Sequence, residues 1–551
     1  MSVRNLVLVG AAAFAAVAIA CGGGGTQEIV VTKTEIKEVP VEVVVEKEVV
    51  REVIKEVPVE RTVIKEVVVE VAPSPLADKQ DLRIAQTNNP VGLHSGETTL
   101  QSESVIQLLY DPYFLFDDDS GEFVGKLATE WAFVDPLTFE MKIRDDVFFH
   151  NGEKLTIPGS IEALDWSRND SGVESLANRN FAGFKTWEAV DDYTIRLGRD
   201  SPNSNPLQGF TRGRFKSHEP KHLAKTGWGG YSDDPVGHGP MQYVDWEREN
   251  FIRMERSPNY WDFDTAIKTI SFHQVGETAV RVAGLQTGDF NVVYSLPVDL
   301  IPRLLKDDFN IFTGQVQQSE VMYLNPKNTE PQMDDKRVRQ AMQYALDIEA
   351  IHGTILGGYA LPIPDGQMGP VGSKGYNPNI TYYPHDPDKA KSLLVEAGYP
   401  DGINVGGVSS IGRYWRNQEV LTAMQAQWKE VGINVDIDFR TSSLWLAALR
   451  AGELGAISDI GMNWYGIFPS TISRVTHPDW QDRMAAIRTE TNQAELDSLL
   501  KEAAAYMHDQ AWAIFAYRIP LVFGLHPDIA DLTWGPSWEP RIKDARVLAS
   551  R

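Results

Sequence analysis

The first residues with a spacing suited to catalysis are His218, Glu219 and His222, which match the His-Glu-x-x-His pattern of zinc proteases. That pattern requires two histidines, one helical turn apart, that face the same metal ion. Pro220 lies between them here. Inside a helix, a proline removes a hydrogen bond and clashes with the preceding turn, whereas it fits the first turn well. The sequence therefore predicts a helix that begins after His218, and a zinc site is the minor alternative.

Other catalytic patterns are missing from the sequence. The chain carries no nucleophile elbow, no Walker A loop and no dinucleotide fingerprint. Its 76 Asp and Glu residues outnumber 52 Lys and Arg residues, and the resulting net charge of -24 repels the phosphates of nucleic acids. We expect neither an enzyme nor a nucleic-acid-binding protein.

The single cysteine, Cys21, follows a segment typical of a secretory signal. Arg4 supplies a positive charge, and the apolar run at 6–20 is short for a permanent membrane span. Residues 18–21 resemble a bacterial lipobox, in which the cysteine is lipidated and becomes the mature N-terminus. An ordinary cleaved signal with an incidental cysteine is the alternative. We expect residues 1–21 to direct export of the protein out of the cytoplasm. We expect a lipid on Cys21 to hold it at the cell membrane.

Residues 22–77 form a segment of unusual composition, a glycine-rich joint followed by a stretch rich in Val, Glu, Lys and Pro. The tetrapeptide Lys-Glu-Val-Pro occurs twice, at 37–40 and 55–58. The β-branched residues and prolines of residues 28–71 disfavour an isolated helix. Three valines at a helical spacing leave a coiled coil as the alternative: Val49, Val53 and Val57. We expect an extended, poorly ordered stalk that holds the rest of the chain clear of the membrane.

The remainder, from residue 78, alternates strand and helix patterns. Segments rich in β-branched and aromatic residues predict strands at 82–85, 139–143, 194–197 and 433–439. Apolar residues at helical spacing predict helices at 336–346, 389–397, 417–431 and 495–508. Because a single core usually stops growing at ~250–300 residues, more than one lobe is expected. The pattern predicts an α/β body with mixed sheets.

Five blocks follow one another along this body. They are Leu-Leu-Tyr-Asp-Pro with Gly-Lys-Leu-Ala-Thr-Glu-Trp (108–112 and 125–131), a strand and turn ending in Phe-His-Asn-Gly (138–152), Gly-His-Gly-Pro with Tyr-Trp (237–240 and 260–261), 335–347, and 386–400. In order and spacing they resemble the extracytoplasmic solute-binding proteins of family 5, the oligopeptide, dipeptide and nickel type of ABC-importer binding protein. His238 stands where that family usually has threonine.

The resemblance implies a periplasmic-binding-protein-like α/β fold, with two main lobes around a cleft and an inserted third lobe. The implied boundaries are 78–112 with 236–322 and 516–551 for lobe I, 113–235 for the inserted lobe II, and 323–515 for lobe III. It implies a monomeric body with no cofactor, which closes on a small solute and delivers it to a membrane permease. A sensory binding lipoprotein without transport and a secreted hydrolase are the rival functions.

The same resemblance places part of the cleft lining at 461–469, where Trp464 matches a family tryptophan. Peptide binders of the family often carry an aspartate three residues later, which pairs with the peptide ammonium, but this chain has Ile467. Because a buried ammonium without a carboxylate is costly, a peptide-like solute is the leading prediction and a sugar or other non-peptide solute the alternative. Aromatic faces suit all of these solutes. The predicted ligand-binding residues are Trp464, Tyr465, Asn463, Trp445, Trp415, Tyr414, Arg413 and Tyr517.

Overall fold

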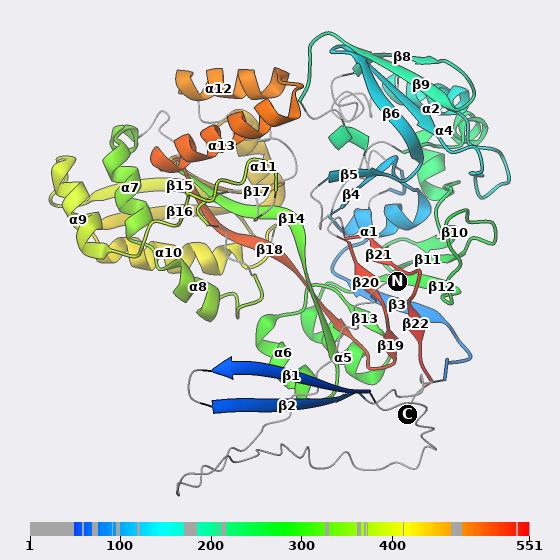
Figure 1. Cartoon of the computed structure of the whole chain (residues 1–551), viewed down its shortest axis with the longest axis horizontal. Coiled ribbons are helices and arrows are strands. Elements are labelled where there is room, and N and C mark those ends of the chain that lie inside the picture. The colour runs from blue at the N-terminus through cyan, green and yellow to red at the C-terminus, as the bar shows by residue number, and fades with distance from the viewer. Residues whose placement is uncertain are drawn as a thin grey trace, which may run out of the picture. The chain divides into compact units, whose positions relative to one another are not determined.

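The computed structural model divides the chain into two units, 1–75 and 76–551 (Figure 1). It describes residues 49–57, 60–68, 75–90, 92–94, 100–117, 122–169, 184–204, 207–210, 216–324, 330–360, 365–367, 371, 373–411, 413–463, 477–535 and 538–549. Cys21 and the rest of the predicted signal lie outside these residues. Within the described residues, no helix has both the length and the apolar character needed to span a membrane.

The described part of the first unit is a two-stranded antiparallel sheet. Strand β1 (Val49–Val57) pairs with β2 (Glu60–Val68), with Val53 opposite Ile64. The coiled-coil alternative is therefore wrong for these segments, which are extended as predicted but pair with each other. The physical reason lies in the repeat: two β-branched segments joined by a short connection can satisfy each other's backbone hydrogen bonds, which a single extended segment leaves to water.

The second unit is built on a ten-stranded mixed sheet, which confirms the α/β prediction. Parallel pairs, such as β3 with β12 and β15 with β16, occur beside antiparallel ones. The strands in spatial order are β10 (Met241–Glu247), β11 (Phe251–Arg256), β12 (Thr269–Gln274), β3 (Asp81–Gln86), β13 (Val292–Val293), β18 (Ala513–Leu525), β14 (Asn310–Leu324), β17 (Ile457–Asn463), β15 (Ile403–Ile411) and β16 (Ile433–Thr441).

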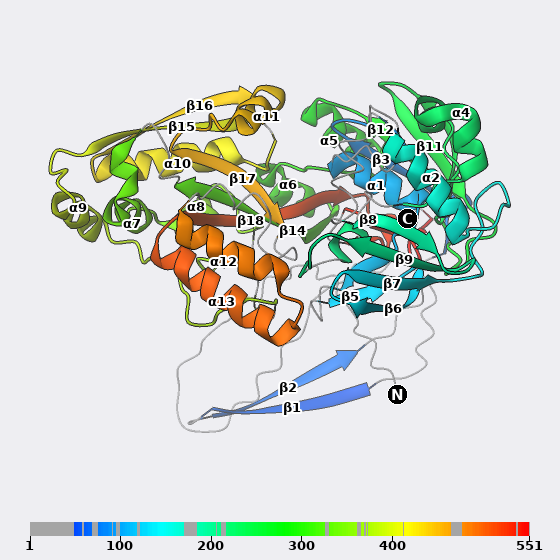
Figure 2. The same ribbon diagram turned by 90° about the horizontal axis from the view of Figure 1, so that it is seen from above.

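Two long strands, β14 and β18, run through both halves of this sheet (Figures 1 and 2). We call the strands from β10 to β13 the β3 half, and β17, β15 and β16 the β15 half. The pairing of β14 with β18 shifts between Gln315 and Ser319, where the five residues 315–319 of β14 oppose three of β18, Arg518 to Pro520. Such irregularities increase the local twist and bend the strand. The two halves are thus joined by a pair of strands with a break in its ladder.

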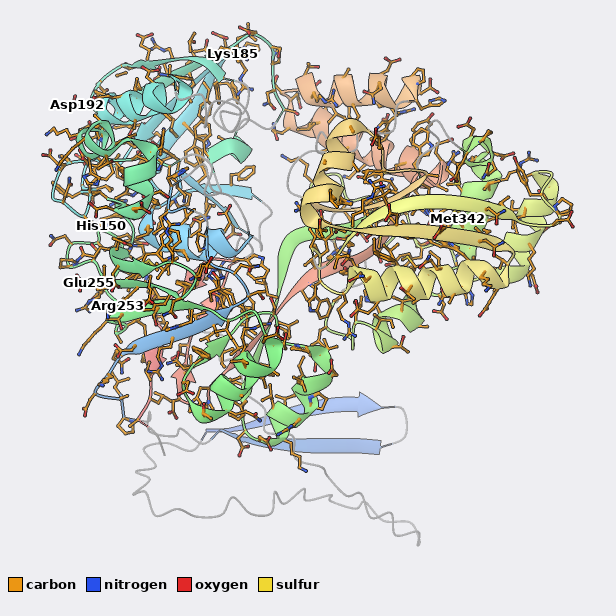
Figure 3. The ribbon with its side chains drawn as sticks, turned by 180° about the vertical axis from the view of Figure 1, so that it is seen from behind. His150, Lys185, Asp192, Arg253, Glu255 and Met342 are labelled. Atoms are coloured by element: carbon orange, nitrogen blue, oxygen red, sulfur yellow. The ribbon has the colours of Figure 1, made fainter. Side chains whose placement is uncertain are left out.

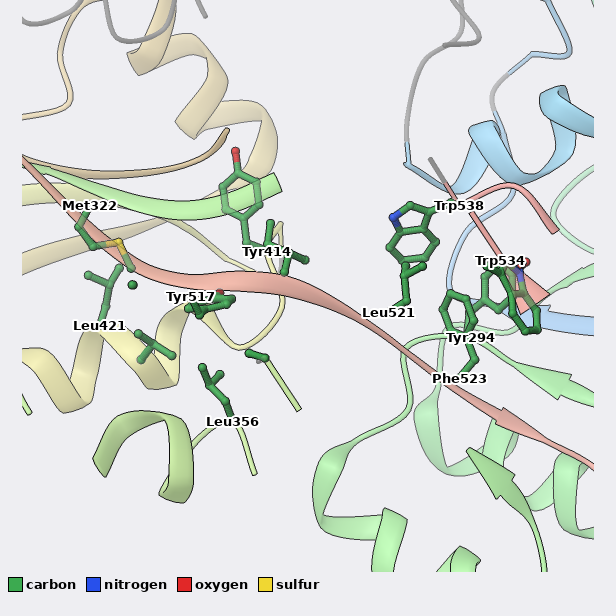
Figure 4. Close-up of a cluster of buried hydrophobic side chains, with 14 of the residues drawn as sticks. Tyr294, Met322, Leu356, Tyr414, Leu421, Tyr517, Leu521, Phe523, Trp534 and Trp538 are labelled. Atoms are coloured by element: carbon green, nitrogen blue, oxygen red, sulfur yellow. Dashed lines mark hydrogen bonds between the residues drawn. The ribbon is translucent and has the colours of Figure 1, made fainter. Parts of the chain in front are cut away.

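Strand β18 carries an aromatic core residue in each half. Phe523 stacks on Tyr294 at 4.2 Å between ring centroids, and the Trp534 Nε1–H donates to the Tyr294 hydroxyl at 2.8 Å. Tyr517, in the β15 half, is buried in the same cluster as Leu356 and Leu421 (Figure 4). The central strands are therefore anchored by packing on both sides of the break.

Helices cover both faces of the β15 half (Figures 1 and 2). Alternate residues of β14 point to opposite faces of the sheet. Val321 and Tyr323 pack with the α12 and α13 side chains on one face, and Met322 packs with those of α10 on the other. The sequence-predicted helices are confirmed as α7, α9, α10 and α13. The bounds are α7 (Lys336–Tyr344), α8 (Ile348–Thr354), α9 (Pro387–Glu396), α10 (Asn417–Glu430), α11 (Ser442–Ala451), α12 (Pro478–Thr489) and α13 (Gln493–Asp509).

A separate four-stranded sheet, in the order β6-β7-β9-β8, has its own core of side chains drawn from residues 113–210. The predicted strands at 82–85, 139–143, 194–197 and 433–439 are confirmed within β3, β7, β9 and β16. The predicted lobe boundaries themselves stay a prediction. The remaining elements are β4 (Phe114–Asp117), β5 (Glu122–Gly125), β6 (Ala128–Asp135), β7 (Thr138–Ile143), β8 (Phe184–Ala189), β9 (Thr194–Arg199), α1 (Leu100–Leu109), α2 (Ile157–Asn169), α4 (Pro220–Asp233), α5 (Thr278–Thr287), α6 (Ile301–Lys306), and the short pairs β19 (Ile529–Ala530) with β22 (Arg546–Val547) and β20 (Thr533–Trp534) with β21 (Pro540–Arg541).

The sequence blocks meet one another in this unit. The carboxylate of buried Asp111 accepts hydrogen bonds from the Tyr260 hydroxyl and the Trp261 indole, both at 2.9 Å, and the Lys126 ammonium lies 3.9 Å away. The ring Nε2 of His150, which is labelled in Figure 3, lies 3.0 Å from the Gly239 carbonyl oxygen. Any side chain at position 239 would bring a Cβ to 2.4 Å from the Leu108 carbonyl oxygen, so this close approach requires glycine. The first three blocks therefore act in packing.

Candidate functional site

The His-Glu-x-x-His segment begins a helix, as the sequence predicts. Helix α4 starts at Pro220, and the Glu219 carboxylate caps it by accepting the backbone N–H of Lys221 (3.2 Å) and of His222 (2.6 Å). His218 is buried against the Tyr110 and Trp228 rings, and burial lowers its pKa to about 3. In the part of the chain that the structure describes, no group of three or more His, Cys, Asp or Glu side chains is placed to hold a metal ion. These three residues serve the helix start and its packing.

Strand β17 leads into the predicted cleft stretch. Asn463, the last residue of β17, pairs with Gln318 of β14. Trp464 and Tyr465, together with Ile467, lie outside the described residues. The structure therefore locates the start of this stretch beside the break in the β14–β18 ladder.

Three predicted residues come together at the carboxyl end of β15. The Arg413 Nε–H donates to the Tyr414 hydroxyl at 3.1 Å, and the Arg413 guanidinium lies 5.0 Å from the centroid of the Trp445 ring. The Tyr414 and Trp445 rings meet edge to face at 6.2 Å. Trp445 is 0% exposed and Tyr414 9%, whereas Arg413 is exposed. The two rings are thus largely covered by protein, and the arginine is the member of the cluster that meets solvent.

Tyr517 and Trp415 form a second contact beside this cluster. The Tyr517 hydroxyl donates to the Trp415 carbonyl oxygen at 2.5 Å. The Trp415 ring is half-buried and packs against the side chains around α5 and α6, in the β3 half, as well as against those around α10. Arg416, with a left-handed φ of 55°, lies 3.8 Å from the Asp299 carboxylate in the β3 half. The segment 413–416 therefore bridges the two halves of the sheet.

Two acidic residues that the sequence analysis missed lie next to these aromatic side chains. Glu320 of β14 and Asp459 of β17 are both 0% exposed. Burial, followed by the charge of Asp459, raises the pKa of Glu320 well above its usual value, and the Arg413 charge opposes this rise. Burial also raises the pKa of Asp459. The available sequence signal was a single carboxylate inside each of two strands, directly beside apolar residues, because a folded protein rarely buries a carboxylate that has no partner.

A separate cavity of about 630 Å³ is lined by residues of α1, of the β4–β5 pair and of the β20–β21 pair, next to the network around Asp111. Its polar lining is mixed in charge, with Lys126 beside Asp111 and Asp262. The Lys126 ammonium is paired with the Asp262 carboxylate and lies 4.8 Å from the Trp261 ring centroid. Lys126 and the two carboxylates beside it are thus engaged with one another.

Comparison with known proteins gives consistent results. Residues 122–481 match the model described as bacterial extracellular solute-binding proteins, family 5 middle. The glutathione-binding protein of Pectobacterium atrosepticum is 29% identical over 341 residues, which cover 61% of this chain and 64% of that protein, so the chain spans just under two thirds of this relative. The glutathione-binding protein of Salmonella typhi is 28% identical over 378 residues, covering 67% of this chain and 71% of that protein.

Solved structures share the fold at lower identity. NikA from Brucella suis, in complex with Fe(III)-EDTA, superposes with a TM-score of 0.74 at 19% identity over 85% of this chain and 99% of its own. A dipeptide-binding protein from Pseudoalteromonas, in complex with Met-Leu, gives a TM-score of 0.71 at 19% identity over 85% of this chain and 100% of its own. The periplasmic-binding-protein-like fold expected from the sequence is thereby confirmed.

Proposed function

Because the chain belongs to the bacterial extracellular solute-binding proteins of family 5, we propose that it captures a small, peptide-like solute and delivers it to the permease of an ABC importer. The observation that carries this proposal is the pair of strands β14 and β18, which joins two halves of one sheet through a break in its ladder. A joint of this kind lets two lobes close around a solute. A solute that contacts both lobes only in the closed state stabilises that state over the open one.

The relatives support a peptide-like solute, since two of them are named for glutathione and a structural neighbour holds Met-Leu. A sugar or other non-peptide solute is the second candidate, because the aromatic face of Trp464 in the proposed cleft lining would suit such a solute as well. The proposal contains no catalytic step.

Thermal melting with a panel of solutes tests this function. The panel contains glutathione, Met-Leu, spermidine and glucose. Each solute is also incubated with the protein to detect any hydrolysis. A solute at 100 times its dissociation constant stabilises the folded state by about 2.7 kcal/mol, so the true solute class raises the melting temperature by several degrees. Hydrolysis of a panel member without such a rise would favour the secreted hydrolase and contradict the proposal.

We propose that the protein works outside the cytoplasm, held at the membrane by a lipid on Cys21. Replacing Cys21 with Ser removes the thiol that carries the lipid. We expect the Cys21→Ser protein to move from the membrane fraction to the soluble fraction, as followed by immunoblotting of fractionated cells. Equal membrane retention of both proteins would contradict the anchor.

Trp464 is proposed to stack against the solute. Losing an aromatic anchor from a desolvated pocket typically costs ~2 kcal/mol or more, which is roughly thirtyfold in dissociation constant. We expect Trp464→Ala to weaken binding of the solute identified by the panel by at least about tenfold, measured by titration calorimetry. The melting temperature of the solute-free variant is the control. A large drop in that temperature would mean that Trp464 packs in the core and does not contact the solute.

A further inference from the structure

His238 lies at the contact between two hydrophobic cores. One is the core of the four-stranded sheet, which we call the β7 core, and the other is a core of the ten-stranded sheet, which we call the main core. The His238 ring is 1% exposed. Its centroid lies 5.5 Å from that of Phe149 in the β7 core and 6.0 Å from that of Tyr110 in the main core, edge to face in both cases. His238 therefore joins the two cores.

Three more histidines gather beside His238. The His218 and His94 rings, 2% and 8% exposed, lie 4.9 Å and 5.0 Å from the Trp228 ring in the main core, measured between centroids. The His150 backbone N–H donates at 2.7 Å to the carbonyl oxygen of the residue before His238. Each of the four rings is close enough to another for their charges to interact. We call the four side chains the histidine junction.

A buried cation, Lys216, lies beside the histidine junction and is 2% exposed. Its Nζ donates to the Gln107 Oε1 at 3.0 Å and to the Tyr110 carbonyl oxygen at 2.9 Å. Its charge acts on both His218 and His238 and opposes their protonation. Placing a second cation in a buried site beside an ammonium is costly, so the junction holds these histidines neutral.

The carboxylates around the histidine junction are already engaged. Glu219 accepts the first backbone N–H groups of α4, and Asp111 accepts two aromatic side-chain donors. Glu103 accepts from a glutamine amide at 3.4 Å. Together with Glu539, Glu103 and Asp111 act on the charge of Lys216. A histidinium in the junction would therefore compete for carboxylates that already stabilise other groups.

We propose that the histidine junction is an acid-sensitive contact, and that mild acid protonates it and separates the four-stranded sheet from the main core. Each core is built from its own side chains, so this opening exposes the junction and leaves both cores folded. The inference goes beyond the proposed function, because it involves neither the solute nor the permease. A protein of an extracellular family meets changes in the surrounding pH directly.

The direction of the pH dependence follows from burial. An exposed histidine has a pKa of about 6.5, whereas burial lowers the pKa of His150 to about 4 and that of His218 to about 3. Burial also lowers the pKa of His238, with a further contribution from the Lys216 charge. The open state thus binds more protons, so the contact keeps its full strength above pH ~6.5 and loses it as the pH falls toward ~4.

The other ionisable groups at the junction do not reverse this direction. Lys216, whose pKa burial lowers to about 8, stays protonated throughout that range. Tyr110 and Tyr231 stay neutral, because burial raises the pKa of both hydroxyls. Burial raises the pKa of Asp111, so its protonation in acid favours the closed contact. One carboxyl group thus opposes three histidines.

Hydrogen exchange followed by mass spectrometry tests the inference on the purified full-length protein, at about pH 7.5 and about pH 5. After correction for the intrinsic exchange rate at each pH, the peptides that contain His150 and His238 should lose protection in acid. Because each histidine contributes about thirtyfold at pH 5 and Asp111 opposes them, we expect a loss of at least about hundredfold. The peptides of β7, β9, β15 and β16 should keep their protection.

The matched variants change one histidine at a time, and each is compared with itself at the two pH values, so a uniform loss of stability cancels. His238→Thr removes one titrating group and should reduce the acid-dependent loss by about thirtyfold. His385→Gln changes an exposed histidine outside the junction and should leave the loss unchanged. Should His238→Thr fail to fold, His218→Phe, which keeps a ring beside Trp228, decides the question.

Equal protection of the two junction peptides at both pH values would overturn the inference. An acid-dependent loss in His238→Thr as large as in the unchanged protein would do the same. Simultaneous loss of protection in the β15 and β16 peptides would show unfolding of the whole unit and would equally contradict the separation of two folded cores.

Discussion

Replacing Trp445 with alanine is expected to lower the free energy of unfolding by about 3–5 kcal/mol, the usual cost of deleting a buried tryptophan side chain. Trp445 is 0% exposed and packs in one cluster with Val321, Val408 and the α12 and α13 side chains. Its removal leaves a cavity that a close-packed interior fills only in part. Denaturant unfolding followed by tryptophan fluorescence or circular dichroism measures this loss.

Arg413→Ala is the matched control for that variant. The Arg413 guanidinium contacts the same Trp445 ring, but the side chain is exposed, so its removal should cost less than about 1 kcal/mol. A Trp445→Ala protein that keeps its stability but loses solute affinity would instead make Trp445 a direct solute contact.

Replacing Asp111 with alanine is expected to destabilise the protein by about 3 kcal/mol, because two buried donors lose their acceptor at once. These donors are the Tyr260 hydroxyl and the Trp261 indole, each at 2.9 Å. The Lys126 ammonium also loses one of its two carboxylates. The loss is measured as a shift of the denaturant midpoint at constant slope.

Asp262→Ala provides the comparison for Asp111. It removes the other carboxylate from Lys126, but the Asp262 side chain is 35% exposed and so contributes a partly solvated ion pair. We expect a loss below about 1 kcal/mol for this variant. Equal losses in the two variants would mean that the ion pair, rather than the two buried hydrogen bonds, stabilises this junction.

Much of the fold was predictable because its signals are local. Lys336–Tyr344 and Asn417–Glu430 form helices where apolar residues repeat at helical spacing, and Asp335 caps the first of them. Glu219 and Pro220 start α4 through contacts within three residues. The pairing of β1 with β2 was not predicted, because strand pairing depends on a partner segment and composition alone does not reveal that partner.

The candidate site was predicted in part. Arg413, Tyr414 and Trp445 do come together, but their burial depends on elements far apart in the sequence. Glu320 and Asp459 were missed for the same reason, since only the pairing of β14 with β17 makes them neighbours. The sequence has Ile467 at the position where peptide binders of the family often carry a carboxylate.

Mass spectrometry of the protein purified without added solute tests the central claim most directly. Under native conditions, we predict a protein peak carrying one small molecule, and denaturation should release a peptide-like compound that rebinds to the emptied protein. A sugar or other non-peptide compound that rebinds would contradict the proposed peptide-like solute. A protein that carries nothing and binds no member of the solute panel would contradict solute capture itself.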